Sequence, residues 1–163
     1  VQFRQMDLHD RILATVAECG LEPRHLEVEI TETLVMENHD AAVHTLNQLD
    51  QAGVRVAIDD FGTGYSSLAY LKHLPVSTLK IDRSFIRDIP ENEDDAAIVR
   101  SVIALAQSMK IDVIAEGVET RDQLEFLHAE HCHRIQGYYL SAPKNAKDIT
   151  DFLHKPAEIS FIH

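Results

Sequence analysis

The sequence predicts an α/β fold of parallel strands, and two observations support this prediction. Short apolar segments typical of strands alternate along the chain with amphipathic helical patterns, and no linker-like stretch interrupts the alternation. Because a parallel strand reaches its neighbour through a crossover that is usually helical, strict alternation favours parallel pairing. With 163 residues, 45% of them hydrophobic, the chain is expected to form a single domain.

Five elements are expected in the first half of the chain. Residues 26–30 alternate apolar and acidic side chains with the period of two typical of a strand, and Gly20 is a common residue type at the end of a helix. The expected elements are a helix over 7–19, a strand over 26–30, a helix over 42–53, a strand over 54–58 and a short helix over 66–73.

The second half continues the same alternation. Its expected elements are a strand over 78–82, a helix over 94–110, a strand over 112–115, a helix that begins after Thr120, a strand over 135–140 and a helix over 146–154. The helical spacing of the long helix predicts an inward face that consists of Ile98, Val102, Leu105 and Met109. Thr120 and Gln123 have the spacing of a capping box at the start of the next helix.

Two architectures suit this order of elements, an open doubly wound sheet and a (β/α) barrel of the TIM type. The open sheet is often a nucleotide-binding fold with a glycine-rich phosphate loop after a strand. No G-x-G-x-x-G or Walker-type loop follows any expected strand in this sequence. The barrel is therefore favoured.

Polar residues occur in all five expected strands, mostly near the carboxyl end, although strands buried on both faces should be almost entirely apolar. These residues are Glu29, Asp59 with Asp60, Lys80, Glu116 and Gln136. In a barrel such positions converge at one mouth, where active sites lie. Because one lysine cannot neutralise four carboxylates, the cluster predicts a divalent cation, and all-oxygen ligation favours Mg²⁺ or Mn²⁺ over zinc.

The residue types suggest individual roles. Asp59 and Asp60 can both reach one site only where the strand gives way to its loop, because neighbours on a regular strand point to opposite faces. There Asp59 could bridge two ions while Asp60 serves one, which suits an in-line attack on phosphorus. Lys80 is interpreted as a cation directed at a phosphate or the attacking water, the alternative being a lysine directed outward. Glu116 could be a general base and Gln136 a neutral hydrogen-bonding group, although spacing does not settle which acid is the base.

Five motifs in order resemble the EAL-domain cyclic di-GMP phosphodiesterases. The motifs are EITE at 29–32, DDFGTGYSSL at 59–68, KIDRSF at 80–85, AEGVE at 115–119 and QGYY at 136–139. The resemblance implies a modified TIM barrel with one strand reversed. It also implies hydrolysis of one phosphodiester of cyclic di-GMP, with Mg²⁺ or Mn²⁺, to linear pGpG.

Site roles follow from the same resemblance. Glu29, Asp59 and Asp60 resemble metal ligands, Lys80 the lysine that orients the catalytic water, Glu116 the base, and Gln136 a residue near the metal-bound water. Glu32 and Glu119 resemble the carboxylates that hold the loop over 61–67, and Phe61, Gly62, Thr63, Gly64 and Asp82 are expected to support the substrate or that loop. In the family the loop also contributes to dimer contacts, so a homodimer through the loop after Asp60 is expected.

Two family ligands have no counterpart in the sequence, the glutamate of the Glu-Ala-Leu signature and an asparagine on the next strand. Because a barrel has eight strands in ~250 residues, the chain is expected to form a partial barrel of about five strands. Residues 1–155 would be the carboxyl-terminal part of an EAL domain and 156–163 a tail. Little hydrolysis is expected of this length alone.

Two alternative functions remain open on the sequence. The first is an inactive EAL-like domain that acts as a cyclic di-GMP receptor or protein-interaction module. The second is a different metal-dependent barrel, such as an aldolase or isomerase, which would not need the loop after Asp60 in this form. A zinc site at His128, His131, Cys132 and His133 is disfavoured, because no spaced second pair of ligands accompanies them and histidines are common at a solvated helix end.

Charge and composition limit the partners and the compartment. The 15 Lys and Arg against 27 Asp and Glu give a formal net charge of -12, which disfavours binding to a DNA or RNA polymer. No apolar run approaches the ~20 residues that span a bilayer, and Cys19 and Cys132 do not form a disulfide pattern. The expectation is a cytoplasmic domain whose parent carries further sensor or cyclase domains and a membrane tether in some arrangements.

Overall fold

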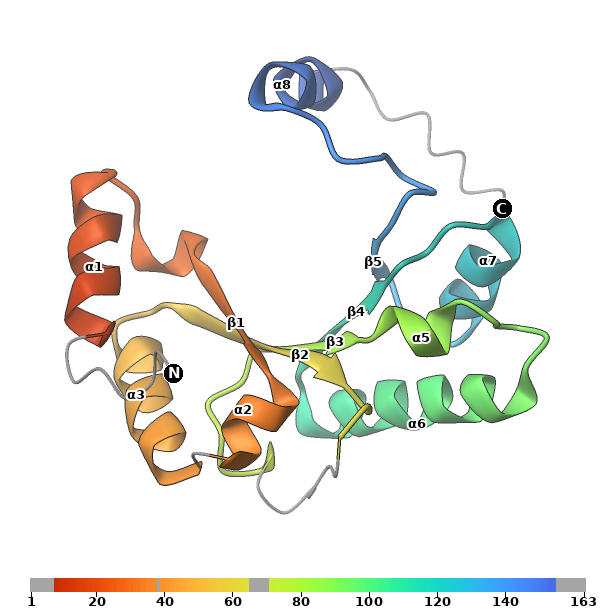
Figure 1. Cartoon of the computed structure of the whole chain (residues 1–163), viewed down its shortest axis with the longest axis horizontal. Coiled ribbons are helices and arrows are strands. Elements are labelled where there is room, and N and C mark those ends of the chain that lie inside the picture. Colours follow the sequence, from red (N-terminus) through yellow and green to blue (C-terminus); the bar gives the residue numbers. More distant parts are fainter. Residues whose placement is uncertain (1–7, 38, 65–70, 155–163) are drawn as a thin grey trace.

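The computed structural model describes residues 8–37, 39–64 and 71–154, and its centre is one five-stranded sheet (Figure 1). The strand order is β1-β2-β3-β4-β5, and all neighbouring pairs are parallel. The strands are β1 Glu27–Thr31, β2 Arg55–Phe61, β3 Thr78–Ile81, β4 Asp112–Glu116 and β5 Arg134–Gln136. The predicted α/β fold with about five parallel strands is confirmed.

Helices lie before, between and after the strands. They are α1 Leu8–Glu18, the 3₁₀ turn η2 Pro23–His25, α2 Glu32–Glu37, α3 His39–Gln51, α5 Arg83–Ile86, α6 Glu93–Met109, α7 Arg121–Ala129 and α8 Ala146–His154. Figure 1 shows α2, α3 and α6 along one side of the sheet, whereas α8 lies apart on the other side. The helix expected over 66–73 falls for the most part on residues outside those described. Among the described residues, no helix has both the length and the apolarity needed to cross a membrane.

The core lies between the sheet and the helices on that side. Ile58 of β2 and Leu79 of β3 are buried in one cluster with Leu46 of α3 and Val99 of α6. Fully burying a leucine or isoleucine side chain contributes about 2 kcal/mol relative to exposure. Apolar packing on one face of the sheet therefore stabilises the strands, and the polar residues lie on the opposite face.

Two strands differ from their expected bounds by more than one residue. β2 continues to Phe61 instead of ending at residue 58, because an irregularity between Ile58 and Phe61 inserts an extra residue relative to β3 and lets the pairing resume. β5 is only three residues long instead of reaching 140. Its chain turns back at Gly137, whose carbonyl oxygen accepts a hydrogen bond from the amide of Leu140 at 3.1 Å.

The helices differ from expectation in two ways. The buried stripe of α6 includes Val99, Val102, Ile103 and Ala106, while Ile98 is 36% exposed, so its expected inward position is wrong. The physical reason is that Val99, Val102, Ile103 and Ala106 follow the spacing of three and four residues around one helical face, and Ile98 lies beside it. The short helices α2 and α5, of six and four residues, were not expected because they are too short to show a helical period.

Candidate functional site

Lys80 lies at the centre of the polar cluster. Its side chain is 5% exposed, and Nζ lies 2.9 Å from Glu29 Oε1, 3.2 Å from Asp59 Oδ1 and 2.6 Å from Glu116 Oε1. These four residues come from β1, β2, β3 and β4. The alternative of an outward-directed lysine is therefore wrong.

Strand register explains why these side chains meet. Lys80 is flanked by Leu79 and Ile81, which are fully buried in the core cluster, so alternation along β3 turns Lys80 to the other face. Parallel pairing brings the carboxyl ends of neighbouring strands to the same edge of the sheet, where Glu116 lies in register with Gln136. The sequence pattern of one polar residue per strand thus becomes one cluster.

Asp59 and Asp60 are brought to this cluster by the irregularity in β2. Asp60 has a φ of 54°, in the left-handed region that aspartate tolerates better than most residues. This conformation departs from the alternation of a regular strand, and the Asp60 carboxyl group is near enough to the Asp59 and Asp82 carboxylates for them to affect its titration. The sequence predicts that the backbone becomes irregular where the strand gives way to its loop. The irregularity lies within β2 instead, between Ile58 and Phe61.

The charges of the cluster perturb its titration. Burial and the neighbouring Asp59 and Asp82 carboxylates raise the pKa of Asp60 above its usual value. Burial opposes the charge of Lys80, but the hydrogen-bonded Glu116 and Glu29 carboxylates and the nearby Asp59 carboxylate outweigh burial and raise the pKa of the lysine. For Asp82, burial acts to raise the pKa, but hydrogen bonds from the Ser84 side chain and from the amides of Ser84 and Arg83 outweigh burial, so the Asp82 pKa lies below its usual value.

The residue types of the cluster suit a hard divalent cation, although among the described residues no three acidic side chains are placed to hold one. One lysine faces three carboxylates directly, and Asp60 and Asp82 add two more acidic groups beside them. Asp59 Oδ1 is buried and has no hydrogen-bond partner among the described residues, although Lys80 Nζ lies 3.2 Å away. A buried carboxylate oxygen without a hydrogen-bond partner is costly unless a cation offsets it. Among the described residues, the carboxylates of Glu29, Asp59 and Glu116 surround Lys80 Nζ. The ammonium group therefore occupies the position where these three side chains meet.

The loop after β2 starts against a buried glutamate. Glu32, at the start of α2, is 2% exposed, and its Oε2 accepts a hydrogen bond from the Gly62 amide at 3.1 Å. The Thr63 hydroxyl donates to the carbonyl oxygen of Asp60 at 2.8 Å, and a side chain added at Gly64 would meet the Glu32 carboxyl group at 3.3 Å. Residues 65–70 of the expected loop lie outside the described residues.

Two predicted site residues are exposed and have no ion pair with Lys80 among the contacts of the described residues. Gln136 is exposed at the end of β5, and its carbonyl oxygen accepts a hydrogen bond from the Val118 amide at 3.2 Å. Glu119 is exposed after β4, and any contact with loop residues from 65 onward falls outside the described residues. Sequence reasoning missed Gln123 as part of this region, because the capping-box spacing accounted for it fully; its contacts are given below.

The histidine cluster at the end of α7 does not form a metal site. The rings of His128 and His133 have centroids 5.5 Å apart, and those of His131 and His133 are 6.3 Å apart. All three are exposed, and in the part of the chain that the structure describes no group of three or more potential ligands could hold an ion. Cys132 is buried and donates a hydrogen bond to the Arg134 carbonyl oxygen at 3.6 Å.

Comparison with known families decides the family of this site. The model of the EAL domain family matches residues 1–143. The chain belongs to the EAL-domain family. EAL relatives include the cyclic di-GMP phosphodiesterase NbdA of Pseudomonas aeruginosa, 47% identical over 146 residues, which cover 90% of this chain and 19% of NbdA. Another is the bifunctional diguanylate cyclase/cyclic di-GMP phosphodiesterase MucR of the same organism, 46% identical over 149 residues, or 91% of this chain and 22% of MucR.

Solved EAL structures share the fold. The P. aeruginosa MucR phosphodiesterase in complex with c-di-GMP has a TM-score of 0.87 and 46% identity, over 91% of this chain and 60% of that one. The EAL domain of Mycobacterium smegmatis DcpA has a TM-score of 0.88 and 42% identity, over 94% and 69%. Klebsiella pneumoniae BlrP1, solved with manganese and cyclic di-GMP, has a TM-score of 0.82 and 34% identity, over 87% and 36%. Membership of the EAL family replaces the aldolase or isomerase alternative.

Proposed function

We propose that the EAL domain to which this chain contributes hydrolyses cyclic di-GMP to linear pGpG with Mg²⁺ or Mn²⁺. The chain spans 19% and 22% of the length of NbdA and MucR, so the activity of the whole protein is part of the proposal. The observation that carries it is the buried Lys80 with Glu29, Asp59 and Glu116 within 3.2 Å of its Nζ. Relatives and structural neighbours named as cyclic di-GMP phosphodiesterases support the choice of substrate.

In the proposed mechanism, Glu29, Asp59 and Asp60 would hold the divalent metal, which supplies a Lewis acid for the phosphoryl group. Lys80 Nζ keeps a positive charge at the centre of the cluster, where it can orient the attacking water and offset charge on the phosphate. Glu116 would accept the proton of that water as the new P–O bond forms and one P–O ester bond of the ring breaks, and the released ribose oxygen would take up a proton from solvent water. Gln136 would serve as a neutral hydrogen-bonding group at the edge of the site.

Two substitutions in the full-length protein test these roles. Glu116→Gln should retain binding of cyclic di-GMP and lower kcat by about 10²- to 10⁴-fold, the usual contribution of a general base. Asp59→Asn should weaken Mn²⁺ binding, measured by titration calorimetry, as well as kcat. Glu125→Gln is a matched control, because Glu125 is exposed and pairs with Arg121 on the surface of α7.

The outcomes separate the proposed functions. If both variants keep the wild-type kcat at saturating metal, the site assignment is wrong. If the wild-type protein binds cyclic di-GMP without turning it over, the domain is a receptor or an interaction module, as the alternative proposal states.

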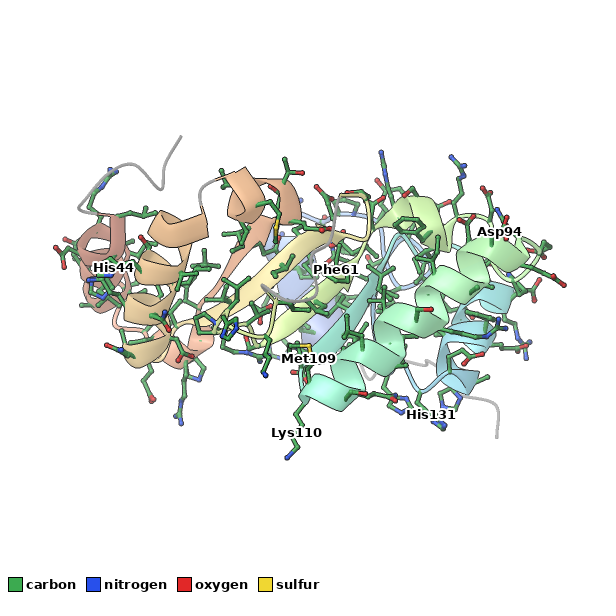
Figure 2. All side chains as sticks on the ribbon, turned by 90° about the horizontal axis from the view of Figure 1, so that it is seen from below. His44, Phe61, Asp94, Met109, Lys110 and His131 are labelled. Atoms are coloured by element: carbon green, nitrogen blue, oxygen red, sulfur yellow. The ribbon has the colours of Figure 1, made fainter. Side chains whose placement is uncertain are left out.

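A homodimer through the loop after Asp60 is also proposed. An apolar groove of about 430 Å³ lies where this loop begins, and Figure 2 shows Phe61 beside α6 on the same face. The groove is lined by Phe61, Gly62, Ala97, Ile98, Ser101, Val102 and Leu105. Ile98→Asp should then shift the sedimentation coefficient of the full-length protein to that of a monomer, and an unchanged dimer would contradict this surface.

The domain boundaries and location are proposals of the same kind. Residues 1–155 are proposed to be the carboxyl-terminal part of the EAL domain, with 156–163 as a tail, and further sensor or cyclase domains are proposed for the parent. A cytoplasmic location is proposed because Cys19 and Cys132 are both free thiols. Limited proteolysis and fractionation of cells would test these two points.

A further inference from the structure

Gln123, in the first turn of α7, makes more contacts than its place in a capping box requires. The residue is 4% exposed. The Gln123 amide donates to Thr120 Oγ1 at 3.2 Å, and its side-chain oxygen accepts from the Thr120 amide at 3.0 Å, which completes the predicted capping box. The same Oε1 accepts from the Glu119 amide at 2.7 Å. Its Nε2 donates to the Arg87 carbonyl oxygen at 3.0 Å.

These contacts link two chain segments, one that follows β3 and one that follows the neighbouring strand β4. Glu119 and Thr120 belong to the segment after β4, which bears Glu116, while Arg87 ends α5, which follows β3 and its Lys80. Figure 1 shows α5 and α7 at the same end of the sheet. One buried amide therefore satisfies two donors on one connection and one acceptor on the other. The side-chain orientation is fixed, because only the oxygen can accept from two N–H groups and only the nitrogen can donate to a carbonyl.

Close packing holds the same segment on its other sides. A side chain at Gly117, which has a φ of 72°, would meet Arg83 Cβ at 2.6 Å, and one at Gly137 would collide with the Val118 backbone. The Val118 carbonyl oxygen also accepts from the Tyr139 amide at 2.9 Å. The segment over 117–120 is thus fixed to α5 and to the turn after β5. In this arrangement Gln123 is the side chain that joins the segment to the end of α5.

We infer that Gln123 is a positioning residue, which holds the Glu119 backbone on α5 and thereby sets Glu116 and Glu119 relative to Lys80. This inference rests on the proposed hydrolysis of cyclic di-GMP. Gln123 does not touch the acidic cluster, so it acts through the segment that it holds. A small displacement of a base or a supporting carboxylate lowers the rate of chemistry more than it lowers binding of the substrate.

Gln123→Met and Thr120→Ala in the full-length protein separate positioning from helix capping. Thr120→Ala removes the cap hydroxyl but leaves the Gln123 bonds to Glu119 and Arg87, whereas Gln123→Met fills a similar volume and removes both. Gln123→Met should lower kcat for cyclic di-GMP about tenfold, with KM changed less than about twofold. Thr120→Ala should leave kcat within about twofold of wild type, although both variants melt at lower temperature.

Amide hydrogen exchange gives a readout that does not depend on activity. The Glu119 amide should exchange faster in Gln123→Met, at least about tenfold, while the Leu127 amide within α7 stays protected. Equal kcat values for the two variants, or unchanged exchange at Glu119, would overturn the inference. If the wild-type protein lacks turnover, the proposed function fails, and the exchange data still decide whether Gln123 holds the segment. If Gln123→Met does not fold, Gln123→Glu provides the test, because its carboxylate loses the donor to Arg87. Its kcat should then fall below that of Thr120→Ala, and equal kcat values would overturn the inference.

Discussion

Lys80 and Glu116 form an ion pair across β3 and β4, with 2.6 Å between Nζ and Oε1. Their side chains are 5% and 18% exposed, and the same ammonium group also pairs with Glu29 and Asp59. Bringing several charges out of water costs several kcal/mol per ion, which is offset only while each charge has a partner. Removal of either partner is therefore expected to lower the stability of the fold.

Lys80→Met should destabilise the protein in the absence of divalent metal. The substitution leaves Glu29, Asp59 and Glu116 close together without the cation that pairs with all three. Removing one partner of a buried ion pair typically costs about 3–5 kcal/mol. Urea unfolding in the presence of a chelator would measure the loss in free energy of unfolding.

Lys147→Met is the matched control for Lys80→Met. Lys147 is an exposed residue of α8, and its substitution should change the free energy of unfolding by less than about 0.5 kcal/mol. Equal stabilities for the two variants would show that the Lys80 cluster does not carry the predicted electrostatic cost.

The polar positions of the cluster could be predicted from the sequence because each breaks a strong rule. A buried parallel strand should be apolar, so Lys80 between Leu79 and Ile81 is conspicuous without any structure. Alternation of strands and helices then determines which ends of the strands meet. The position of Asp60 could be predicted only as a need for irregular backbone, since nothing local specifies where along β2 the extra residue falls.

Contacts that depend on three-dimensional proximity could not be predicted in this way. The Gln123 side chain donates a hydrogen bond to the carbonyl oxygen of Arg87, which lies 36 residues earlier in the sequence. No periodic pattern links Gln123 to Arg87. The exposure of Ile98 could not be predicted either. Its spacing from Val102 and Leu105 is helical, so the sequence pattern alone does not separate it from the buried residues of α6. Side-chain partners of long sequence separation are set by packing rather than by local propensity.

Glu32→Ala should release the start of the loop after β2. The substitution removes the buried acceptor of the Gly62 amide, which is partly buried, and should cost about 1 kcal/mol, the low end of the range for an unsatisfied buried donor. Glu32→Gln should cost less, because its amide oxygen can still accept from Gly62. Hydrogen exchange of the Gly62 amide would rise in Glu32→Ala, and similar exchange in both variants would contradict this role.

Arg55→Met should weaken a polar network at the amino ends of the strands. Arg55 lies 3.3 Å from Glu27 and 3.0 Å from Asp112, which Arg134 also approaches at 2.6 Å. Because the Arg55 side chain is 37% exposed, the loss in free energy of unfolding should be only about 1 kcal/mol.

Salt and a second arginine test the Arg55 network. The destabilisation by Arg55→Met should shrink at ~1 M salt, where the screening length falls to about 3 Å. Arg24→Met is the control, since Arg24 pairs with Glu22 on the surface, where both side chains are more than half exposed. A loss that is equal for the two arginines, or independent of salt, would contradict a network contribution.

Cys132 should make stability fall in alkaline solution. Burial raises the pKa of the Cys132 thiol, and hydrogen bonds with Arg134 and Ala115 oppose that shift only in part. A folded-state pKa above the unfolded value means that this contribution to stability is complete below the unfolded pKa of about 8.5. It is then lost as pH rises through the raised folded pKa.

Unfolding of wild type, Cys132→Ala and Cys19→Ala between about pH 8 and 9.5 would test this dependence, because a cysteine titrates near 8.5 when unperturbed. Wild type and Cys19→Ala should lose stability with rising pH, since Cys19 is exposed, whereas Cys132→Ala should have the shallower slope. Alkylation gives an independent measure, because the exposed Cys19 thiolate should react with iodoacetamide at least about tenfold faster than Cys132 at pH 8. Equal alkylation rates would show that Cys132 is accessible, and an unchanged slope in Cys132→Ala would assign the pH dependence to other groups.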